Sequence, residues 1–210
     1  NKLGVANVQF EEIIDFDFAK DTLARHDRPF GYIFLFKWTG GKDEEKKALS
    51  DDSLLFIKQN VTNSCATIAI LHLAFNVAGI QVNQDLQGFK EFITELPADM
   101  RGMALTNSEC IRSAHNSFIS FGSINADSDE KAEEGDAFHF VALLPRGDQL
   151  VVLDGMTDEP YVAAADKTAD EVDIVMQYVK GKISESGGEI RFSLLAMVPD
   201  QLTKLKEQLE

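Results

Sequence analysis

The sequence predicts an α+β fold within one domain, residues 1–210, in which helices flank a central antiparallel sheet. Strand-like and helix-like segments are mixed along the chain, without the strict alternation that is typical of a parallel α/β protein. The 210 residues are 44% apolar, which is enough for one sizeable core. No internal repeat and no linker rich in proline or serine divides the chain.

Strands are predicted where short apolar runs carry many aromatic and β-branched residues. These runs are Gly31–Trp38, Phe138–Leu144, Leu150–Leu153 and Ile190–Val198. Between the second and third runs, Pro145-Arg146-Gly147-Asp148 predicts a tight turn, so these two strands should form a hairpin. Two charged stretches, Thr39–Asp52 and Asn125–Asp136, predict exposed loops.

Two capping boxes predict where helices begin. Thr106-Asn107-Ser108-Glu109 would open a helix that runs to about Phe118. Thr168-Ala169-Asp170-Glu171 would open another, which runs to about Ile183. The other peripheral helices are predicted at the amphipathic segment Asp85–Leu96 and at the chain end, with Pro199 in the first turn of the last helix.

A helix that is apolar on nearly every side is predicted around Cys65. Asn63 or Ser64 can cap its start, and the apolar pattern continues to Val77. Gly79 suits the end of this helix because glycine accepts the backbone conformation found there. A helix without a polar face should be buried, so we expect this one in the middle of the domain.

The acidic composition restricts the classes of partner. The chain has 35 acidic and 20 basic residues, a formal net charge of −15. Because phosphates would be repelled, nucleic acids and anionic membranes are not expected as partners. A substrate with a basic docking segment would be attracted. Alternatively, the charge only keeps the protein soluble.

Two cysteines, Cys65 and Cys110, are too few for a disulfide scaffold, and neither stands in a C-x-x-C pair. The sequence therefore gives no support for a zinc site, and we expect no metal and no cofactor. The longest mostly apolar stretch, Ala66–Ile80, is too short to span a bilayer, and no secretory signal opens the chain. These features predict a soluble intracellular protein.

Cys65 is the candidate nucleophile because it would lie in the first turn of the central helix. There the helix dipole and the unpaired N–H groups favour a thiolate, the reactive form of cysteine. A neighbouring imidazolium would lower the pKa of the thiol further. Taken alone, a cysteine on a buried apolar helix is more often an inert core residue.

His139 and Asp154 are the candidate base and its orienting carboxylate. If the hairpin turn is centred between Arg146 and Gly147, these two residues face each other, with Cβ atoms about 4.5–5.5 Å apart. The carboxylate would then bind one imidazole nitrogen and leave the other for the thiol. Taken alone, His139 would be a satisfied strand histidine and Asp154 a turn residue. The register favours the catalytic interpretation.

Gln59 is the candidate donor to the oxyanion that develops during acyl transfer. It lies six residues before Cys65, on the approach to the central helix. Its amide, together with the backbone N–H of Cys65, could form an oxyanion hole. A glutamine seen in isolation would instead be taken as an ordinary surface residue.

Three motifs closely resemble the active-site motifs of the ubiquitin C-terminal hydrolase family. Gln59-Asn60-Val61-Thr62-Asn63-Ser64-Cys65-Ala66-Thr67 resembles the family's cysteine motif. Ala137-Phe138-His139-Phe140-Val141 resembles its histidine strand, and Leu153-Asp154-Gly155 its aspartate strand. The gaps of six residues from Gln59 to Cys65 and fifteen from His139 to Asp154 also fit.

Further matches lie outside the site, and together they extend the resemblance from about Gln9 to Lys206. They are Ile33–Trp38, Ala104–Ser108, His115–Phe118 and Glu189–Phe192. These segments look most like the proteasome-associated, C-terminally extended branch of the family. Compared with that branch, we expect the chain to lack a segment upstream of Gln9 and most of the proteasome-docking tail.

The resemblance implies a papain-like core with a knotted backbone and a thiol hydrolase that cleaves bonds at the C-terminal glycine of ubiquitin. It implies Cys65 as nucleophile, His139 as general base and then acid, Asp154 as orienter and Gln59 as oxyanion donor. It implies ubiquitin and the proteasome as partners, and residence in the cytoplasm and nucleus. Residues 122–136 would form the loop that crosses over the active site.

That loop holds six acidic residues and one basic residue, Lys131. The acidic ones are Asp127, Asp129, Glu130, Glu133, Glu134 and Asp136. They either attract the basic tail of ubiquitin or form a solvated loop without a steering role. Two rival functions stay open at this point: a ubiquitin-binding proteasome adaptor with silent or partner-dependent catalysis, and a papain-like protease with another substrate.

Overall fold

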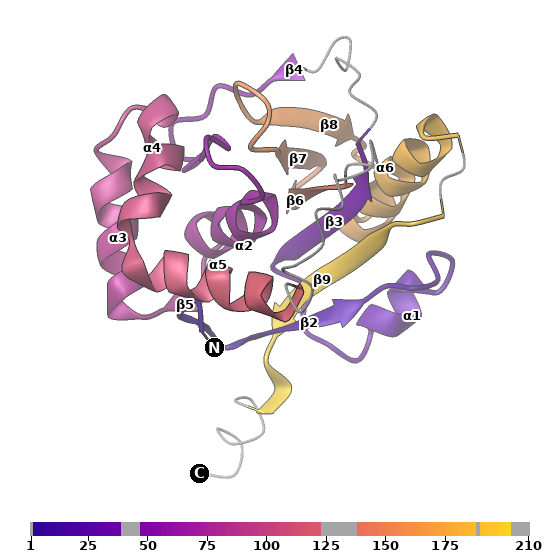
Figure 1. The fold of residues 1–210 in the computed structure, drawn as a ribbon. Helices are drawn as coiled ribbons and strands as arrows, with labels where there is room; N and C mark the ends of the chain where they lie inside the picture. Colours follow the sequence, from indigo (N-terminus) through magenta and orange to yellow (C-terminus); the bar gives the residue numbers. More distant parts are fainter. Residues whose placement is uncertain (1, 39–46, 123–137, 188–189, 203–210) are drawn as a thin grey trace, which may run out of the picture.

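The computed structural model describes residues 2–38, 47–122, 138–187 and 190–202, with side chains of 118–122 left out of the description. A seven-stranded antiparallel sheet, in the order β2-β9-β3-β6-β7-β8-β4, is the centre of the described fold (Figure 1). Its strands are β2 (Val8–Glu12), β3 (Gly31–Lys37), β4 (Lys47–Ala48), β6 (Phe138–Arg146), β7 (Gln149–Leu153), β8 (Tyr161–Ala165) and β9 (Ser193–Pro199). A separate short pair joins β1 (Val5–Ala6) and β5 (Gln81–Val82).

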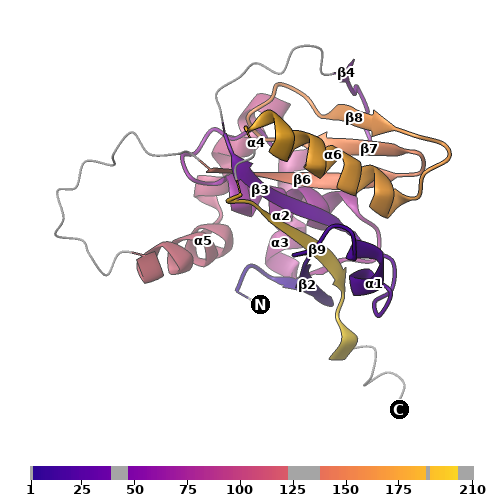
Figure 2. The same cartoon turned by 90° about the vertical axis from the view of Figure 1, so that its right-hand side faces the viewer.

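Helices cover both faces of the sheet. Those described are α1 (Ala19–Leu23), α2 (Cys65–Asn76), α3 (Gln84–Thr94), α4 (Ala98–Ala104), α5 (Glu109–Gly122) and α6 (Glu171–Glu185), with a 3-10 turn η1 (Leu105–Asn107). Helices α2 to α5 gather on one side, and α1 and α6 lie on the other (Figures 1 and 2). This arrangement confirms the predicted α+β class with a central antiparallel sheet flanked by helices.

The alternation of buried side chains along the strands explains why both faces are covered. On β7, Leu150 and Val152 pack with α6, while Val151 and Leu153 pack with α2. All four side chains are buried, as expected for a strand between two helical layers. On its other side, α2 contributes to a third apolar cluster with α3 and α5, through residues such as Leu71 and Phe75. The predicted central position of α2 is therefore confirmed.

The predicted strands of the sheet centre are confirmed, with small changes at their ends. The segment predicted as Ile190–Val198 begins only at Ser193 and extends to Pro199, which pairs with Val8. The prediction that Pro199 opens a last helix is therefore wrong. Gln201 and Leu202 are helical, and the rest of the predicted helix lies outside the described residues.

Both capping boxes were placed two residues too early. Ser108, not Thr106, stands before α5, where its hydroxyl accepts a hydrogen bond from the Ile111 N–H at 3.4 Å. Asp170, not Thr168, caps α6 by accepting from the Asp173 N–H at 2.9 Å. In each tetrad the third residue also carries a side-chain acceptor, and that residue takes the capping position.

Of the predicted loops, residues 39–46 and 123–137 lie outside the description, so the crossover loop stays a prediction. Lys47–Ala48, predicted as loop, forms β4 at the sheet edge against β8. No helix in the described part of the chain is both long and apolar enough to cross a membrane.

Candidate active site

Cys65 is the first residue of α2, as the sequence predicts. Ser64 occupies the capping position, but its hydroxyl donates to the Val61 carbonyl oxygen at 2.7 Å instead of capping the helix. Asn63 turns the chain into the helix with φ 61°, a left-handed conformation that asparagine tolerates better than most residues. Because no side chain caps this end, the N–H groups of the first turn can serve an anion at the cysteine.

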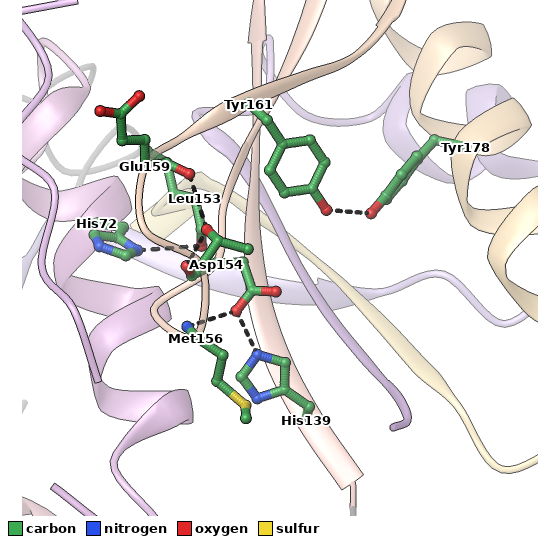
Figure 3. Close-up of polar contacts among 9 residues, drawn as sticks. His72, His139, Leu153, Asp154, Met156, Glu159, Tyr161 and Tyr178 are labelled. Atoms are coloured by element: carbon green, nitrogen blue, oxygen red, sulfur yellow. Dashed lines mark hydrogen bonds and ion pairs between the residues drawn. The ribbon is translucent and has the colours of Figure 1, made fainter. Parts of the chain in front are cut away.

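His139 and Asp154 form a buried pair (Figure 3), and the His139 side chain is hydrogen-bonded to Cys65 at the start of α2. The imidazole Nε2 lies 2.6 Å from Asp154 Oδ1, and the two residues are 3% and 7% exposed. The Met156 N–H also donates to Oδ1, at 2.9 Å, so the carboxylate is held from two directions. Phe36, paired with His139 across β3 and β6, meets the imidazole edge-on with ring centroids 6.0 Å apart. With Nε2 bound to Asp154, Nδ1 is the ring nitrogen left for Cys65.

The predicted hairpin register is wrong by two residues. Arg146 pairs with Gln149, so the turn is Gly147-Asp148, where Gly147 has φ 63°. Asp154 follows the last paired residue of β7 and is not directly opposite His139. A shift of two residues keeps each side chain on its original face, and the diagonal distance is within reach of two polar side chains.

The three groups alter one another's protonation. Burial raises the pKa of the Cys65 thiol, but hydrogen bonds from His139 and from the Phe140 and Ala66 N–H groups outweigh burial and lower it. Burial lowers the pKa of His139, yet the hydrogen bonds and charges of Asp154 and Cys65 raise it to about 9. Both shifts favour a thiolate–imidazolium pair at neutral pH, the reactive state of a cysteine nucleophile.

Gln59 lies on the irregular segment that leads into α2, beside the residues that follow Asp154. Its backbone N–H donates to the Gly155 carbonyl oxygen at 2.7 Å. A Cβ atom at Gly155 would stand 3.2 Å from the Gln59 Cβ, so the close approach depends on glycine. The side-chain Oε1 of Gln59 is buried and makes no hydrogen bond with any described residue. This acceptor is therefore buried without a hydrogen-bond donor among the described residues, although Gln59 as a whole is half-buried.

The other histidines and the second cysteine make contacts outside the group formed by Cys65, His139 and Asp154. His115 Nδ1 lies 3.0 Å from the Thr67 hydroxyl, and His26 Nδ1 accepts from the Gln201 amide at 3.1 Å. Cys110 is half-buried, and its Sγ lies 3.7 Å from the Leu3 carbonyl oxygen. His72, on α2, makes two buried hydrogen bonds to the backbone of the segments that carry Gln59 and Asp154. A polar residue on an otherwise apolar helix is the signal that points to it.

Comparison with known proteins places the chain in a family. The profile of the ubiquitin carboxyl-terminal hydrolase, family 1, matches residues 1–184. This chain belongs to that family. The ubiquitin carboxyl-terminal hydrolase isozyme L5 of Dictyostelium discoideum is 35% identical over 214 residues, and ubh-4 of Caenorhabditis elegans is 34% identical over 211 residues. Each alignment covers 99% of this chain, which spans 60% and 64% of the lengths of these two relatives.

A solved structure of the family has the same fold. The crystal structure of the Trichinella spiralis UCH37 catalytic domain bound to ubiquitin vinyl methyl ester superposes with a TM-score of 0.78 at 30% identity. The superposition covers 95% of this chain and 88% of that chain. The family and the branch that the sequence motifs resemble are thereby confirmed.

Proposed function

We propose that this chain is a cysteine-type deubiquitinase that cleaves amide, isopeptide or ester bonds at the C-terminal glycine of ubiquitin. The observation that carries the proposal is the 2.6 Å contact between His139 and Asp154 beside a cysteine at the uncapped start of α2. Membership of the ubiquitin carboxyl-terminal hydrolase family supports it. So does the solved UCH37 relative, which is bound to ubiquitin vinyl methyl ester.

In this mechanism the Cys65 thiolate attacks the carbonyl carbon of the ubiquitin C-terminal glycine. The carbonyl oxygen becomes an oxyanion, to which the Gln59 carboxamide and the Cys65 N–H donate hydrogen bonds. His139 gives its Nδ1 proton to the departing amine, and a thioester joins ubiquitin to the enzyme. Water then loses a proton to the same nitrogen and attacks the thioester, which releases ubiquitin and restores the thiolate.

Asp154 keeps the imidazole in the tautomer that this sequence of steps needs. Because its Oδ1 accepts from Nε2, the proton that moves during turnover is carried by Nδ1, next to Cys65. The Met156 N–H fixes the same oxygen and therefore limits rotation of the carboxylate. Asp154 orients the base and stabilises its positive charge without exchanging a proton itself.

Ubiquitin is the proposed partner, and the net charge of −15 suits a protein that receives a basic C-terminal tail. Association with the proteasome, and work in the cytoplasm and nucleus, are further parts of the proposal. The resemblance of the motifs to the proteasome-associated branch supports them.

A ubiquitin-based electrophile tests the proposed function directly. Ubiquitin vinyl methyl ester should form a covalent adduct on Cys65, detected by intact-mass and peptide mass spectrometry. Cys65→Ala should form no adduct and still bind ubiquitin, while Cys110→Ala should react like the parent chain. Reversible binding without an adduct would instead identify a silent adaptor. Reaction with electrophiles of related modifiers, but not of ubiquitin, would identify a protease with another substrate.

A further inference from the structure

His72 is a buried histidine in the middle of α2 for which the proposed mechanism has no use. Its side chain is 0% exposed. It follows Cys65 by seven residues, close to two helical turns, so the two side chains project from nearly the same side of the helix. A buried imidazole is costly unless its nitrogens are hydrogen-bonded, and both of them are.

The two hydrogen bonds define the protonation state of the ring. The Ile57 N–H donates to Nε2 at 3.0 Å, so Nε2 is an acceptor. Nδ1 lies 3.2 Å from the Leu153 carbonyl oxygen, which can only accept, so Nδ1 carries the proton (Figure 3). The ring is therefore neutral, and its donor and acceptor each match a backbone group. Phe56 stacks on the ring at 5.2 Å between centroids and 11° between planes.

The backbone groups that His72 joins belong to the two segments that carry site residues. Leu153 directly precedes Asp154, and Ile57 is two residues before Gln59. One further bond, from the N–H of Gln59 itself to the Gly155 oxygen at 2.7 Å, connects the same two segments just past Asp154. The imidazole therefore sets their spacing at one end, and the direct backbone bond sets it at the other.

We propose that His72 is a positioning residue for the hydrolase reaction: its neutral imidazole bridges the Gln59 and Asp154 segments and holds both site residues relative to Cys65. This rests on the proposed function. Without the bridge, each segment loses a buried backbone partner and moves to regain one, so the carboxylate and the carboxamide leave their places. The loss should appear in kcat more than in KM, because both groups act on the transition state.

Three variants separate positioning from packing. His72→Phe keeps a ring against Phe56 and removes both hydrogen bonds. His72→Gln keeps one donor and one acceptor on a single side chain. Leu71→Val is the matched control, since Leu71 is also 0% exposed on α2 but packs toward α3 and α5. Each is assayed with a ubiquitin C-terminal amide reporter, at a temperature where circular dichroism finds all chains folded.

We expect kcat to fall at least about tenfold in His72→Phe with little change in KM, since small displacements of reacting groups cost this much or more. His72→Gln should recover part of the loss, and Leu71→Val should keep the parent kcat despite a lower unfolding midpoint. A kcat for His72→Phe within about twofold of the parent value overturns the proposal, as does an equal loss in all three variants.

A parent chain that does not turn over the reporter would refute the proposed function, and a second measurement then decides the role of His72. The rate at which iodoacetamide alkylates Cys65 is followed against pH in a Cys110→Ala background. His72→Phe should raise the pH midpoint, because a displaced Asp154 supports His139, and through it the thiolate, less well. An unchanged midpoint overturns the proposal.

Discussion

Replacing Asp154 by Asn removes the charge at the site and keeps the shape of the side chain. In the native protein burial lowers the pKa of His139, but Asp154 and Cys65 together raise it to about 9 from an ordinary value of 6.5. That difference corresponds to about 3 kcal/mol in favour of the imidazolium, shared between its two partners. Since His139 is only 3% exposed, solvent screens little of this interaction.

Loss of the Asp154 charge should change the protonation of the Cys65 thiol indirectly, through its effect on His139. Without the carboxylate the imidazolium is less stable, so at pH 7 fewer molecules hold the thiolate–imidazolium pair. If Asp154 supplies most of the 3 kcal/mol, kcat/KM at neutral pH should fall by up to about a hundredfold. The pH midpoint for Cys65 alkylation should rise at the same time, because the thiol has lost the cation that lowers its pKa.

Alkylation by iodoacetamide, from about pH 5 to pH 10, measures the thiolate fraction without needing a substrate. A Cys110→Ala background leaves Cys65 as the reacting thiol. Asp158→Asn is the matched control: it also removes a carboxylate, but one whose side chain is 95% exposed and paired with Lys58. If Asp154→Asn and Asp158→Asn have the same alkylation midpoint, the carboxylate does not support the thiolate and the electrostatic reasoning is refuted.

Three further perturbations test other parts of the structure. Gln59→Ala should lower kcat by about 10²–10³-fold with a small effect on KM, measured with the amide reporter, and an unchanged kcat would exclude it from the oxyanion hole. Gly102→Ala should lower the free energy of unfolding in urea by about 1–3 kcal/mol or more, because its Cβ would stand 1.8 Å from the Lys58 carbonyl oxygen. Gly88→Ala, on an exposed part of α3 with no atom within 4 Å of the new Cβ, should instead stabilise by about 0.5–1 kcal/mol, and equal effects would contradict the packing. Burial lowers the pKa of His72 from 6.5 to about 4, so the unfolded chain binds this proton first as pH falls. The histidine's contribution is therefore complete above pH 6.5 and is lost as pH falls toward 4, by about 3 kcal/mol in total. Between pH 4 and pH 6.5, the free energy of unfolding in urea should depend on pH more steeply in the parent than in His72→Phe. Parallel slopes would refute the lowered pKa of His72.

The strands at the centre of the sheet could be predicted from the sequence, whereas those toward its edges could not. Each of β3, β6 and β7 is a nearly continuous apolar run because helices cover both of its faces. Strand β2 is an edge strand that ends in Glu11 and Glu12, and β8 is mostly alanine after Tyr161 and Val162. Charges protect an edge from further pairing, and alanine has little preference for strands, so neither segment has a strand-like composition.

The contact between His139 and Asp154 could be predicted although the hairpin register was wrong, and the reason is geometric. Side chains alternate between the faces of a strand with a period of two, so a register error of two residues leaves His139 and Asp154 on a common face. An error of one residue would have separated them. The sequence Gly147-Asp148 could have predicted the observed turn. Glycine at the first position of a two-residue loop accepts the positive φ that Gly147 has.

The role proposed for His72 could not be predicted from the types of residue in the sequence. The candidate site residues could be recognised because their side chains act on one another, and a cysteine, a histidine and a carboxylate are distinctive in the sequence. The partners of His72 are the backbone N–H of Ile57 and the backbone oxygen of Leu153, groups that nearly every residue possesses. Nothing in the side chains of those two residues identifies them as its partners. Only the fold brings them within reach of one imidazole, so this positioning role emerges from the structure and not from the motif.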